Sequence, residues 1–468
     1  MAHIVQKALL VLFMLTVLGA CSGDDSTTIN IEAPSNNGGD SGGGNSGGGD
    51  SSGGGSGDGG TPASCPEGTS EVSEGLCELP QTVSSDLTLS AGVSYLMSDR
   101  VTVGNGNGQL ETNNDGSLDD GSAVQAVTLT IEAGVQVFGK SGTFANLLIT
   151  RGSKIMAMGT AEAPIIFSSD DEGYEGSGEW GGLIIHGYAP HNECAEGGSY
   201  CDIDSEGESG FAGGYDPDDS SGVLRYVVVA EGGYEFSTGN EINGISLVGV
   251  GSGTEMDYIQ VHGNSDDGIE FYGGNVNVKH GVFTNNNDDS VDWDEGYQGN
   301  LQYIIVKQGA SKGEAFEMDT EGSSQGFLSK PTLANVTIIN DKVADRAAYS
   351  LNFKKRSGGF FHNTVVTVAD SSETAVDTCI NVDGSGSEEL VSTALVINNW
   401  IQDCGVGAGV HGRLSSANVV FDATTVVEAD ADLDDILSSQ APEASGLAPL
   451  DWDAINGAYA ESVADGDY

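Results

Sequence analysis

Basic side chains are scarce in this chain: 16 Lys and Arg residues stand against 70 Asp and Glu, which gives a formal net charge of −54 over 468 residues. Recognition of nucleic-acid phosphates needs a basic footprint, so nucleic-acid binding is excluded. Adsorption to an anionic lipid surface by charge is excluded for the same reason. Cations and neutral or basic polymers remain as partners, although acid also serves simply to keep a surface protein soluble.

Long apolar runs are missing after Ala20. Residues 1–20 carry Lys7 and then a short apolar stretch, which is too short to span a bilayer and is typical of a signal peptide. Residues 18–21 read LGAC, which resembles the lipobox of bacterial lipoproteins. The resemblance implies cleavage before Cys21 and lipid attachment to it, so that outer-membrane lipid becomes a partner. Because Ser22 rather than Asp follows, we expect an outer-membrane lipoprotein on the cell surface or the periplasmic face.

Apolar residues are almost absent from residues 21–64, which consist mainly of Gly, Ser, Asn and Asp. Such a segment cannot bury enough surface to fold. We therefore predict a disordered linker that holds the folded part away from the membrane.

No C-x-x-C pair occurs, so a zinc ribbon or a redox motif has no support. Six cysteines remain besides Cys21, and six cysteines allow fifteen connectivities. Pairing between sequence neighbours is the simplest scheme, and an oxidising compartment permits it. The predicted disulfides are Cys65–Cys77, Cys194–Cys201 and Cys379–Cys404, the first of which closes an N-terminal cap at residues 65–80.

Helical periodicity is missing from residues 81–425, which instead contain short β-branched stretches separated by Gly, Asn and Asp. Such stretches predict short strands, and their spacing fits a sandwich as well as a solenoid. A repeat favours the solenoid: residues 266–271 read DDGIEF, and residues 288–293 read DDSVDW, so the two segments match position by position at one fixed offset. An offset of this size is one turn of a solenoid. An aromatic residue followed by a β-branched strand also recurs, at Tyr226, Tyr258 and Tyr303.

These observations predict an all-β fold, a right-handed parallel β-helix solenoid over residues 81–425, followed by a short C-terminal cap or tail at residues 426–468. The run GEWGGLIIHG at residues 178–187, together with DDGIEFYGG at residues 266–274, resembles a group of bacterial surface lipoproteins. The resemblance implies a parallel β-helix of the pectin-lyase-like type, an acidic tether and no settled activity.

Carboxylates one period apart stack at strand spacing, about 4.8 Å, in a solenoid. The candidate metal ligands are Asp266, Asp267, Glu270, Asp288, Asp289, Asp292 and Asp294. Strand alternation turns Phe271 and Trp293 toward the core, and Glu270, Asp292 and Asp294 outward. Stacked like charges repel, and a cation, raised pKa values or water and salt relieve the repulsion. Hard oxygen ligands suit Ca²⁺, so a calcium site is one hypothesis, a solvated acidic face is the second, and catalysis is the third.

Two further sets of residues, one aromatic and one basic, are candidates for contact with a ligand. The candidate ligand-binding residues form an aromatic platform for sugars; they are Trp180, Tyr272, Trp293 and Tyr297. The alternative is that Trp180 and Trp293 belong to the core. Lys354-Lys355-Arg356 is the main basic cluster, and it either pairs with the acidic coils, which we favour, or contacts an anionic sugar.

The sequence thus predicts a non-enzymatic surface lipoprotein, a binding or adhesion module that is calcium-stabilised and directed to glycans or other surface proteins. The first alternative is a polysaccharide lyase or glycoside hydrolase, because glycosidases use two carboxylates, about 5–5.5 Å apart for retention or 6.5–9.5 Å for inversion, and neighbouring coils can supply either. No polygalacturonase or lyase motif set can be assembled here, so no catalytic residue is assigned. The second alternative is a structural component of the envelope or surface layer.

Overall fold

The structure is a computed structural model. It describes residues 64–110, 116–171, 173–174, 176–194, 201–204, 207–236, 241–308, 313–320, 328–340, 349–368, 378–382, 395–402, 410–412, 420–421 and 426–428. The expected signal peptide, Cys21, the linker up to residue 63, Cys404 and the tail beyond residue 428 lie outside the described residues.

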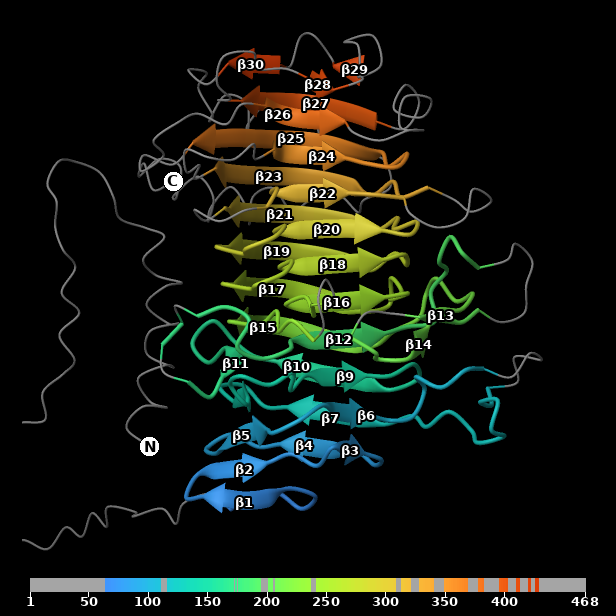
Figure 1. The fold of residues 1–468 in the computed structure, drawn as a ribbon, viewed down its shortest axis with the longest axis vertical. Coiled ribbons are helices and arrows are strands. Elements are labelled where there is room, and N and C mark those ends of the chain that lie inside the picture. Colours follow the sequence, from blue (N-terminus) through green and yellow to red (C-terminus); the bar gives the residue numbers. More distant parts are fainter. Residues whose placement is uncertain are drawn as a thin grey trace, which may run out of the picture.

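Two long sheets, called sheet A and sheet B, wind together around one axis and form a stack of coils (Figure 1). Sheet A contains β1 (Ser70–Ser73), β2 (Leu76–Glu78), β4 (Leu87–Leu89), β5 (Ser94–Met97), β7 (Thr128–Ile131), β8 (Gln136–Gly139), β10 (Lys154–Met158), β11 (Ile165–Ser169), β15 (Gly222–Ala230), β17 (Glu255–His262), β19 (Asn277–Thr284), β21 (Asn300–Lys307), β23 (Thr332–Asn340), β25 (Gly359–Val368), β27 (Leu395–Gln402), β29 (Val420–Phe421) and β30 (Val426–Glu428). Sheet B contains β3 (Thr82–Val83), β6 (Val101–Val103), β9 (Leu147–Ile149), β12 (Leu183–His186), β16 (Ile245–Val248), β18 (Ile269–Tyr272), β20 (Val291–Asp294), β22 (Phe316–Met318), β24 (Tyr349–Phe353), β26 (Thr378–Val382) and β28 (Val410–Gly412).

Neighbouring coils pair in parallel within each sheet. Glu255 of β17 pairs with Asn277 of β19, and Ile269 of β18 pairs with Val291 of β20, so the offset between the two acidic segments is one coil. Among the described strands, only β1 with β2 and the small pair β13 (Ile203–Asp204) with β14 (Phe211–Ala212) run antiparallel. The predicted all-β parallel β-helix is confirmed. No helix capable of crossing a membrane occurs among the described residues.

Sheet A turns a corner in every coil. In the lower coils two strands flank a short turn, as with β10 and β11, both of which pair with β15. In the upper coils one long strand bends at a single residue with a positive φ, for example Tyr226 at 50° and Tyr258 at 55°. These corner residues stack: the ring centroids of Tyr226, Tyr258 and His280 are 4.3 Å apart in each step, and Tyr303 follows at 5.0 Å. The recurring aromatics of the sequence are therefore an outer column at the corner.

The core is a continuous column of inward-facing apolar side chains. In β18 and β20, Ile269, Phe271, Val291 and Trp293 are at most 1% exposed, as their alternation predicts. Tyr297 stacks on Phe271 at 4.2 Å between centroids. This packing fixes which residues of sheet B face outward.

An amide column sits in the turn between sheet A and sheet B. Asn264 donates its backbone N–H to Asn286 Oδ1 at 3.1 Å and its side-chain Nδ2 to Asp267 O at 2.7 Å. One coil beyond Asn286, Gln308 Nε2 donates to Gly313 O at 2.5 Å. These bonds fix the turn in which the acidic segments begin.

Two of the predicted disulfides are confirmed. Cys65 bonds to Cys77, and Cys194 bonds to Cys201, with Cα–Cα separations of 5.6 and 5.4 Å. The third predicted pair includes Cys404, outside the described residues.

Candidate functional site: a grid of carboxyl groups

Carboxyl groups of three successive coils form a grid on and beside the outer face of sheet B. Its first column lies in the turn before each strand, its second column in the strands, and its third column at the strand ends. We call these eight side chains the acid grid: Asp267, Asp289 and Glu314 in the first column, Glu270, Asp292 and Glu317 in the second, and Asp294 and Asp319 in the third. Tyr272 takes the remaining position, because it pairs with Asp294.

The first column is held by backbone amides. Asp289 donates its backbone N–H to Asp267 Oδ1 at 2.9 Å, and Glu314 donates its backbone N–H to Asp289 Oδ1. Each carboxyl group is thus bonded to the coil above it. Asp267 is 6% exposed and Asp289 is 1% exposed, so both are buried.

Burial raises the pKa of Asp267, Asp289 and Asp292 well above the ordinary value of 3.8. Neighbouring carboxylates raise it further: mainly Asp289 for Asp267, Glu314 for Asp289, and Glu270 for Asp292. A charged carboxylate is disfavoured both by low dielectric and by like charges nearby. A bound divalent cation would reverse this effect because it is itself the largest local charge.

Three groups of carboxyl oxygens are close enough to share one ion, with the ligand atoms of each group within 4.8 Å of one another. The groups are Asp266 with Asp267 and Asp288, Asp267 with Asp289 and Asp292, and Asp289 with Glu314 and Glu317. All donors are hard oxygens, which suit Ca²⁺. Asp292 Oδ1 is buried and has no hydrogen-bond partner among the described residues. The donor set therefore fits a calcium ion.

The carboxyl groups at the two ends of the acid grid have different partners. Below, Glu270 Oε2 accepts hydrogen bonds from Asn243 Nδ2 at 2.5 Å and from the Tyr272 hydroxyl. Above, Lys354 forms an ion pair with Glu317, and Lys355 Nζ lies 3.3 Å from Asp319. The expected internal pairing of the basic cluster is thus confirmed for both lysines.

Six of the seven predicted metal ligands lie in or next to these groups. Asp266, Asp267, Asp288, Asp289 and Asp292 belong to them, and Glu270 adjoins Asp292 in the second column. Asp294 lies in the third column, outside all three groups. The residues predicted to point outward do face away from the core, but Glu270 is only 8% exposed because Asn243 and Tyr272 cover it.

Sequence reasoning missed Glu314 and Glu317. Residues 313–319 read GEAFEMD, which repeats the alternation of DDSVDWD at residues 288–294. The sequence separation is 25 between Asp289 and Glu314, whereas it is 22 between Asp267 and Asp289. The upper coil is therefore longer, and a search that allowed unequal coils would have found both glutamates.

The aromatic platform predicted for sugars is contradicted by the structure. Trp180, Trp293 and Tyr297 are each 0% exposed and belong to the core, with Trp293 Nε1 donating to Ser357 Oγ at 3.0 Å. Tyr272 faces outward but is 8% exposed, because it packs against Cys201, Ile203 and Ala212. No ring face of the four is available for stacking a sugar.

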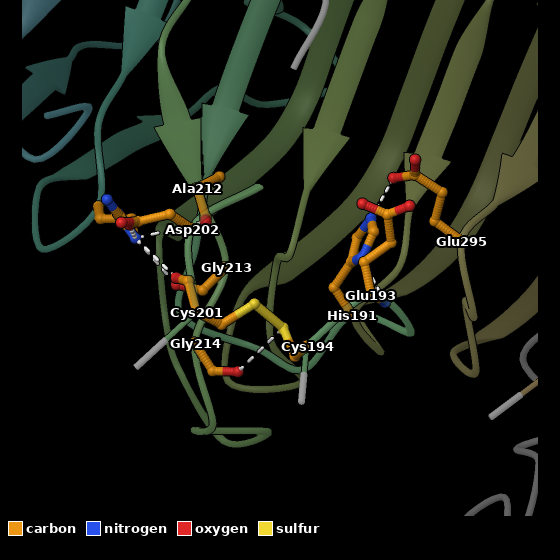
Figure 2. Close-up of a disulfide and its surroundings, with 10 residues drawn as sticks. His191, Glu193, Cys194, Cys201, Asp202, Ala212, Gly213, Gly214 and Glu295 are labelled. Atoms are coloured by element: carbon orange, nitrogen blue, oxygen red, sulfur yellow. Dashed lines mark hydrogen bonds and ion pairs between the residues drawn. A yellow bond between two sulfur atoms is a disulfide. The ribbon is translucent and has the colours of Figure 1, made fainter. Parts of the chain in front are cut away.

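Tyr272 is covered by an insertion between β12 and β15, residues 187–221, which we call the insert. Its disulfide, Cys194–Cys201, lies close to Asp202 (Figure 2), and Asp202 forms an ion pair with Arg151. Arg151 is 0% exposed, and its Nη1 lies 2.9 Å from Asp202 Oδ1. The same side chain also donates to the backbone carbonyl groups of Gly106, Gly108, Cys201, Ala212 and Gly213.

The insert also reaches the middle coil of the acid grid, directly after β20. His191 Nε2 pairs with Glu295 (Figure 2), and Asn192 donates its backbone N–H to Glu295 O at 2.9 Å. Because Glu295 follows Asp294, the insert is fixed at one edge of the grid.

Comparison with known families agrees with this architecture. Residues 101–435 match the family described as pectate-lyase-like beta helix domain. The match covers most of the chain, so the protein belongs to this family. No curated protein and no solved structure matches the chain.

Proposed function

We propose that this protein is a surface-displayed β-helix that binds Ca²⁺ through its acid grid and serves as a non-catalytic binding module. The observation that carries the proposal is the group Asp267, Asp289 and Asp292, whose oxygens lie within 4.8 Å of one another. The two lysines near the grid pair with Glu317 and Asp319 instead, although the charge of Lys354 also lowers the pKa of Asp292. Buried carboxylates are stable only when protonated or paired with a cation, and Ca²⁺ meets that need at neutral pH.

Calorimetric titration of metal-free protein with Ca²⁺ tests this proposal. We expect saturable binding by the wild type and a loss of at least about tenfold in affinity in Asp289→Asn, because that residue belongs to two of the three groups. Glu162→Gln is the matched control, since it removes one exposed acid outside the grid. Binding that is absent from the wild type, or equally weak in both variants, would contradict the proposal.

Attachment of lipid to Cys21 and display at the outer membrane are part of the same proposal. Support comes from the LGAC run at residues 18–21 and from the Gly- and Ser-rich residues that follow it. A coil of about 40 residues, as this composition predicts, would have an r.m.s. reach of roughly 35 Å and would hold the solenoid clear of the membrane. Adhesion to glycans or to other surface proteins is the role that such a display favours.

A glycan is the ligand class we propose, because the description of the family refers to a polysaccharide-degrading enzyme. A glycan array probed with and without Ca²⁺ tests it. Binding of a defined glycan set that is lost in EDTA supports the proposal. Binding to no glycan, combined with capture by a purified surface protein, would assign a protein partner instead.

A carbohydrate-active enzyme is the second candidate. Asp267 and Asp289 have neighbouring carboxyl oxygens, and both have a raised pKa, as a general acid requires. Reducing-sugar and unsaturated-product assays on pectin, alginate and neutral glycans decide between the candidates. Product formation that disappears in Asp267→Asn and Asp289→Asn would establish the enzyme, whereas the binding module gives no product with any of these substrates.

A further inference from the structure

The insert bonds to the ends of two strands that carry the acid grid, β18 and β20. Just after β18, Gly274 donates its backbone N–H to Pro190 O at 2.8 Å. Just after β20, Glu295 O accepts the backbone N–H of Asn192 at 2.9 Å. Residues 190–194, which we call the clamp, therefore join two neighbouring coils beside the grid.

A buried histidine directs the clamp to Glu295. His191 is 0% exposed, its Nδ1 accepts the backbone N–H of Glu193 at 3.1 Å, and its Nε2 pairs with the Glu295 carboxyl group (Figure 2). Glu295 has a φ of 56°, in the left-handed region that residues other than glycine rarely adopt. Such strain persists only where the surrounding structure holds it, and the clamp holds both the side chain and the carbonyl group of this residue.

Glu295 is linked to the proposed calcium site through β20. Its backbone N–H donates to Asp294 Oδ1 at 2.5 Å, and Asp292 lies two residues earlier on the same strand. Asp292 Oδ1 is buried and has no hydrogen-bond partner among the described residues. The strained end of the strand is therefore three residues away from a ligand of the proposed site.

The disulfide connects the clamp to the part of the insert that covers Tyr272. Cys194 is the last residue of the clamp, and Cys201 packs against Tyr272. The Tyr272 hydroxyl donates to Glu270, which is the neighbour of Asp292 in the second column of the grid. One covalent bond thus joins the contacts that the insert makes with β18 and β20.

The two sides of the disulfide differ in what else holds them. Cys201 O accepts a hydrogen bond from Arg151, whose guanidinium group also pairs with Asp202. Cys194 donates its backbone N–H to His191 O at 3.0 Å, within the clamp itself. Without the disulfide, Arg151 still holds the Cys201 side, whereas the clamp loses its link to that side.

We propose that the disulfide Cys194–Cys201 is a redox-sensitive lock on the clamp, and that its reduction frees the clamp, relaxes the end of β20 and weakens Ca²⁺ binding. The inference rests on the proposed calcium site and adds its regulation. The reductant is a dithiol: it passes two electrons and two protons to the cysteines, so that their S–S bond breaks, two thiols form and the dithiol closes to its own disulfide.

The first experiment is calorimetric titration of the full chain with Ca²⁺, at a temperature at which circular dichroism shows each protein to be folded. Cys194→Ser/Cys201→Ser should bind at least about fivefold more weakly than the wild type, the lower end of typical coupling between sites. Cys65→Ser/Cys77→Ser is the matched control, because that disulfide has a similar Cα–Cα separation but closes the N-terminal cap. It should bind as the wild type does.

Reduction tests the lock in the unaltered chain. Dithiothreitol should weaken binding by the wild type to the level of Cys194→Ser/Cys201→Ser, and reoxidation should restore it. His191→Ala should bind weakly and respond little to the reductant, because its clamp is already open. Glu193→Gln is the control for this variant, since it keeps the backbone N–H that His191 accepts.

Each other outcome contradicts a defined statement. Equal binding by oxidised and reduced wild type overturns the lock and leaves the proposed function standing. Equal weakening in Cys65→Ser/Cys77→Ser overturns it too, because the effect would then come from general loss of stability. A full response of His191→Ala to the reductant would exclude the clamp as the route. The absence of calcium binding in all of these proteins would overturn the proposed function together with this inference.

Discussion

Asp289 is the middle member of the first column of the acid grid and the most buried side chain of the grid, at 1% exposure. It accepts a hydrogen bond from the backbone of Glu314 and donates its own backbone N–H to Asp267. Its structural role, the bonding of one coil to the next, survives protonation, because a neutral carboxyl oxygen still accepts a hydrogen bond. Its charge, in contrast, is costly unless a cation is bound.

This cost predicts an unusual dependence of stability on pH in metal-free protein. The pKa values of Asp267, Asp289 and Asp292 are raised above 3.8 in the folded state, so the folded state holds these protons more tightly than the unfolded state. The stability that comes from binding these protons is fully present below about pH 4. It is lost as the pH rises through the pKa values of the folded state.

We therefore expect a lower melting temperature at pH 8 than at pH 5 in EDTA, and a smaller difference in Asp289→Asn. Calorimetric melting at fixed ionic strength measures both. A wild type that melts at the same or a higher temperature at pH 8 would show that these carboxyl groups are not buried as described.

The buried indoles give a second prediction at the scale of single residues. Replacing a fully buried Trp by Ala typically lowers the free energy of unfolding by about 3–5 kcal/mol. We expect this loss for Trp180→Ala and Trp293→Ala, measured by denaturant unfolding. A loss below about 0.5 kcal/mol, typical of exposed sites, would restore the aromatic platform.

At the scale of elements, the corner of sheet A combines strain with stacking. Tyr226, Tyr258, His280 and Tyr303 all have φ between 50° and 59°, a region that L-residues other than glycine rarely adopt. Each ring is stacked on its neighbour in the next coil, and such pairs contribute about 0.5–1.5 kcal/mol. Stacking along the solenoid axis thus offsets the backbone strain in each coil.

Substitutions of Tyr258 separate the two effects. Tyr258→Ala loses both stacking contacts and keeps the strained φ, so we expect the free energy of unfolding to fall by about 1–3 kcal/mol. Tyr258→Gly also loses the stacking but relieves the strain, since glycine adopts positive φ freely. Denaturant unfolding should therefore rank glycine above alanine at this position; the reverse order would mean that the corner is not strained.

We expect Arg151 to hold the insert more firmly than its disulfide does. Closing a loop of this length adds roughly 2.5 kcal/mol, whereas removing one partner of a buried ion pair costs about 3–5 kcal/mol. We expect Arg151→Met to destabilise the protein more than the Cys194→Ser/Cys201→Ser double variant. Limited proteolysis of the insert and denaturant unfolding measure the two effects. A larger effect of the cysteine changes would assign the main restraint to the disulfide.

Much of this arrangement could be predicted from the sequence, because strand alternation and a fixed period are local signals. They placed Phe271 and Trp293 in the core and stacked Asp267 below Asp289. The same alternation, applied consistently, excludes Trp293 from an outer platform. Glu314 escaped detection because its sequence separation from Asp289 is 25, whereas the period that links Asp289 to Asp267 is 22.

Other features could not be predicted because they depend on contacts distant in sequence. The burial of Tyr272 comes from the insert, and the position of the insert depends on Arg151, which binds a segment far downstream in the chain. The sequence indicated that the basic cluster pairs with the acidic coils, but it did not identify Glu317 as the partner of Lys354. No sequence period links these two residues.

At the scale of the whole molecule, the proposed anchor places an acidic solenoid on a long tether above the membrane. We expect the mature chain to begin at Cys21 with acyl groups attached, and to fractionate with the outer membrane. Mass spectrometry of the N-terminal peptide measures the first point, and a Cys21→Ser variant should lose membrane association. An unmodified N-terminus at another residue would exclude the lipoprotein.

The central claim is that the acid grid is a cation site that stabilises the β-helix. The most direct measurement is thermal unfolding of the wild type and Asp289→Asn in EDTA and in Ca²⁺, at fixed ionic strength and neutral pH. Saturation a hundredfold above Kd adds about 2.7 kcal/mol to the free energy of unfolding. We therefore expect the melting temperature of the wild type to rise by several degrees in Ca²⁺, and that of Asp289→Asn to change little. Equal melting temperatures of the wild type in EDTA and in Ca²⁺ would contradict the claim and identify the grid as solvated acid alone.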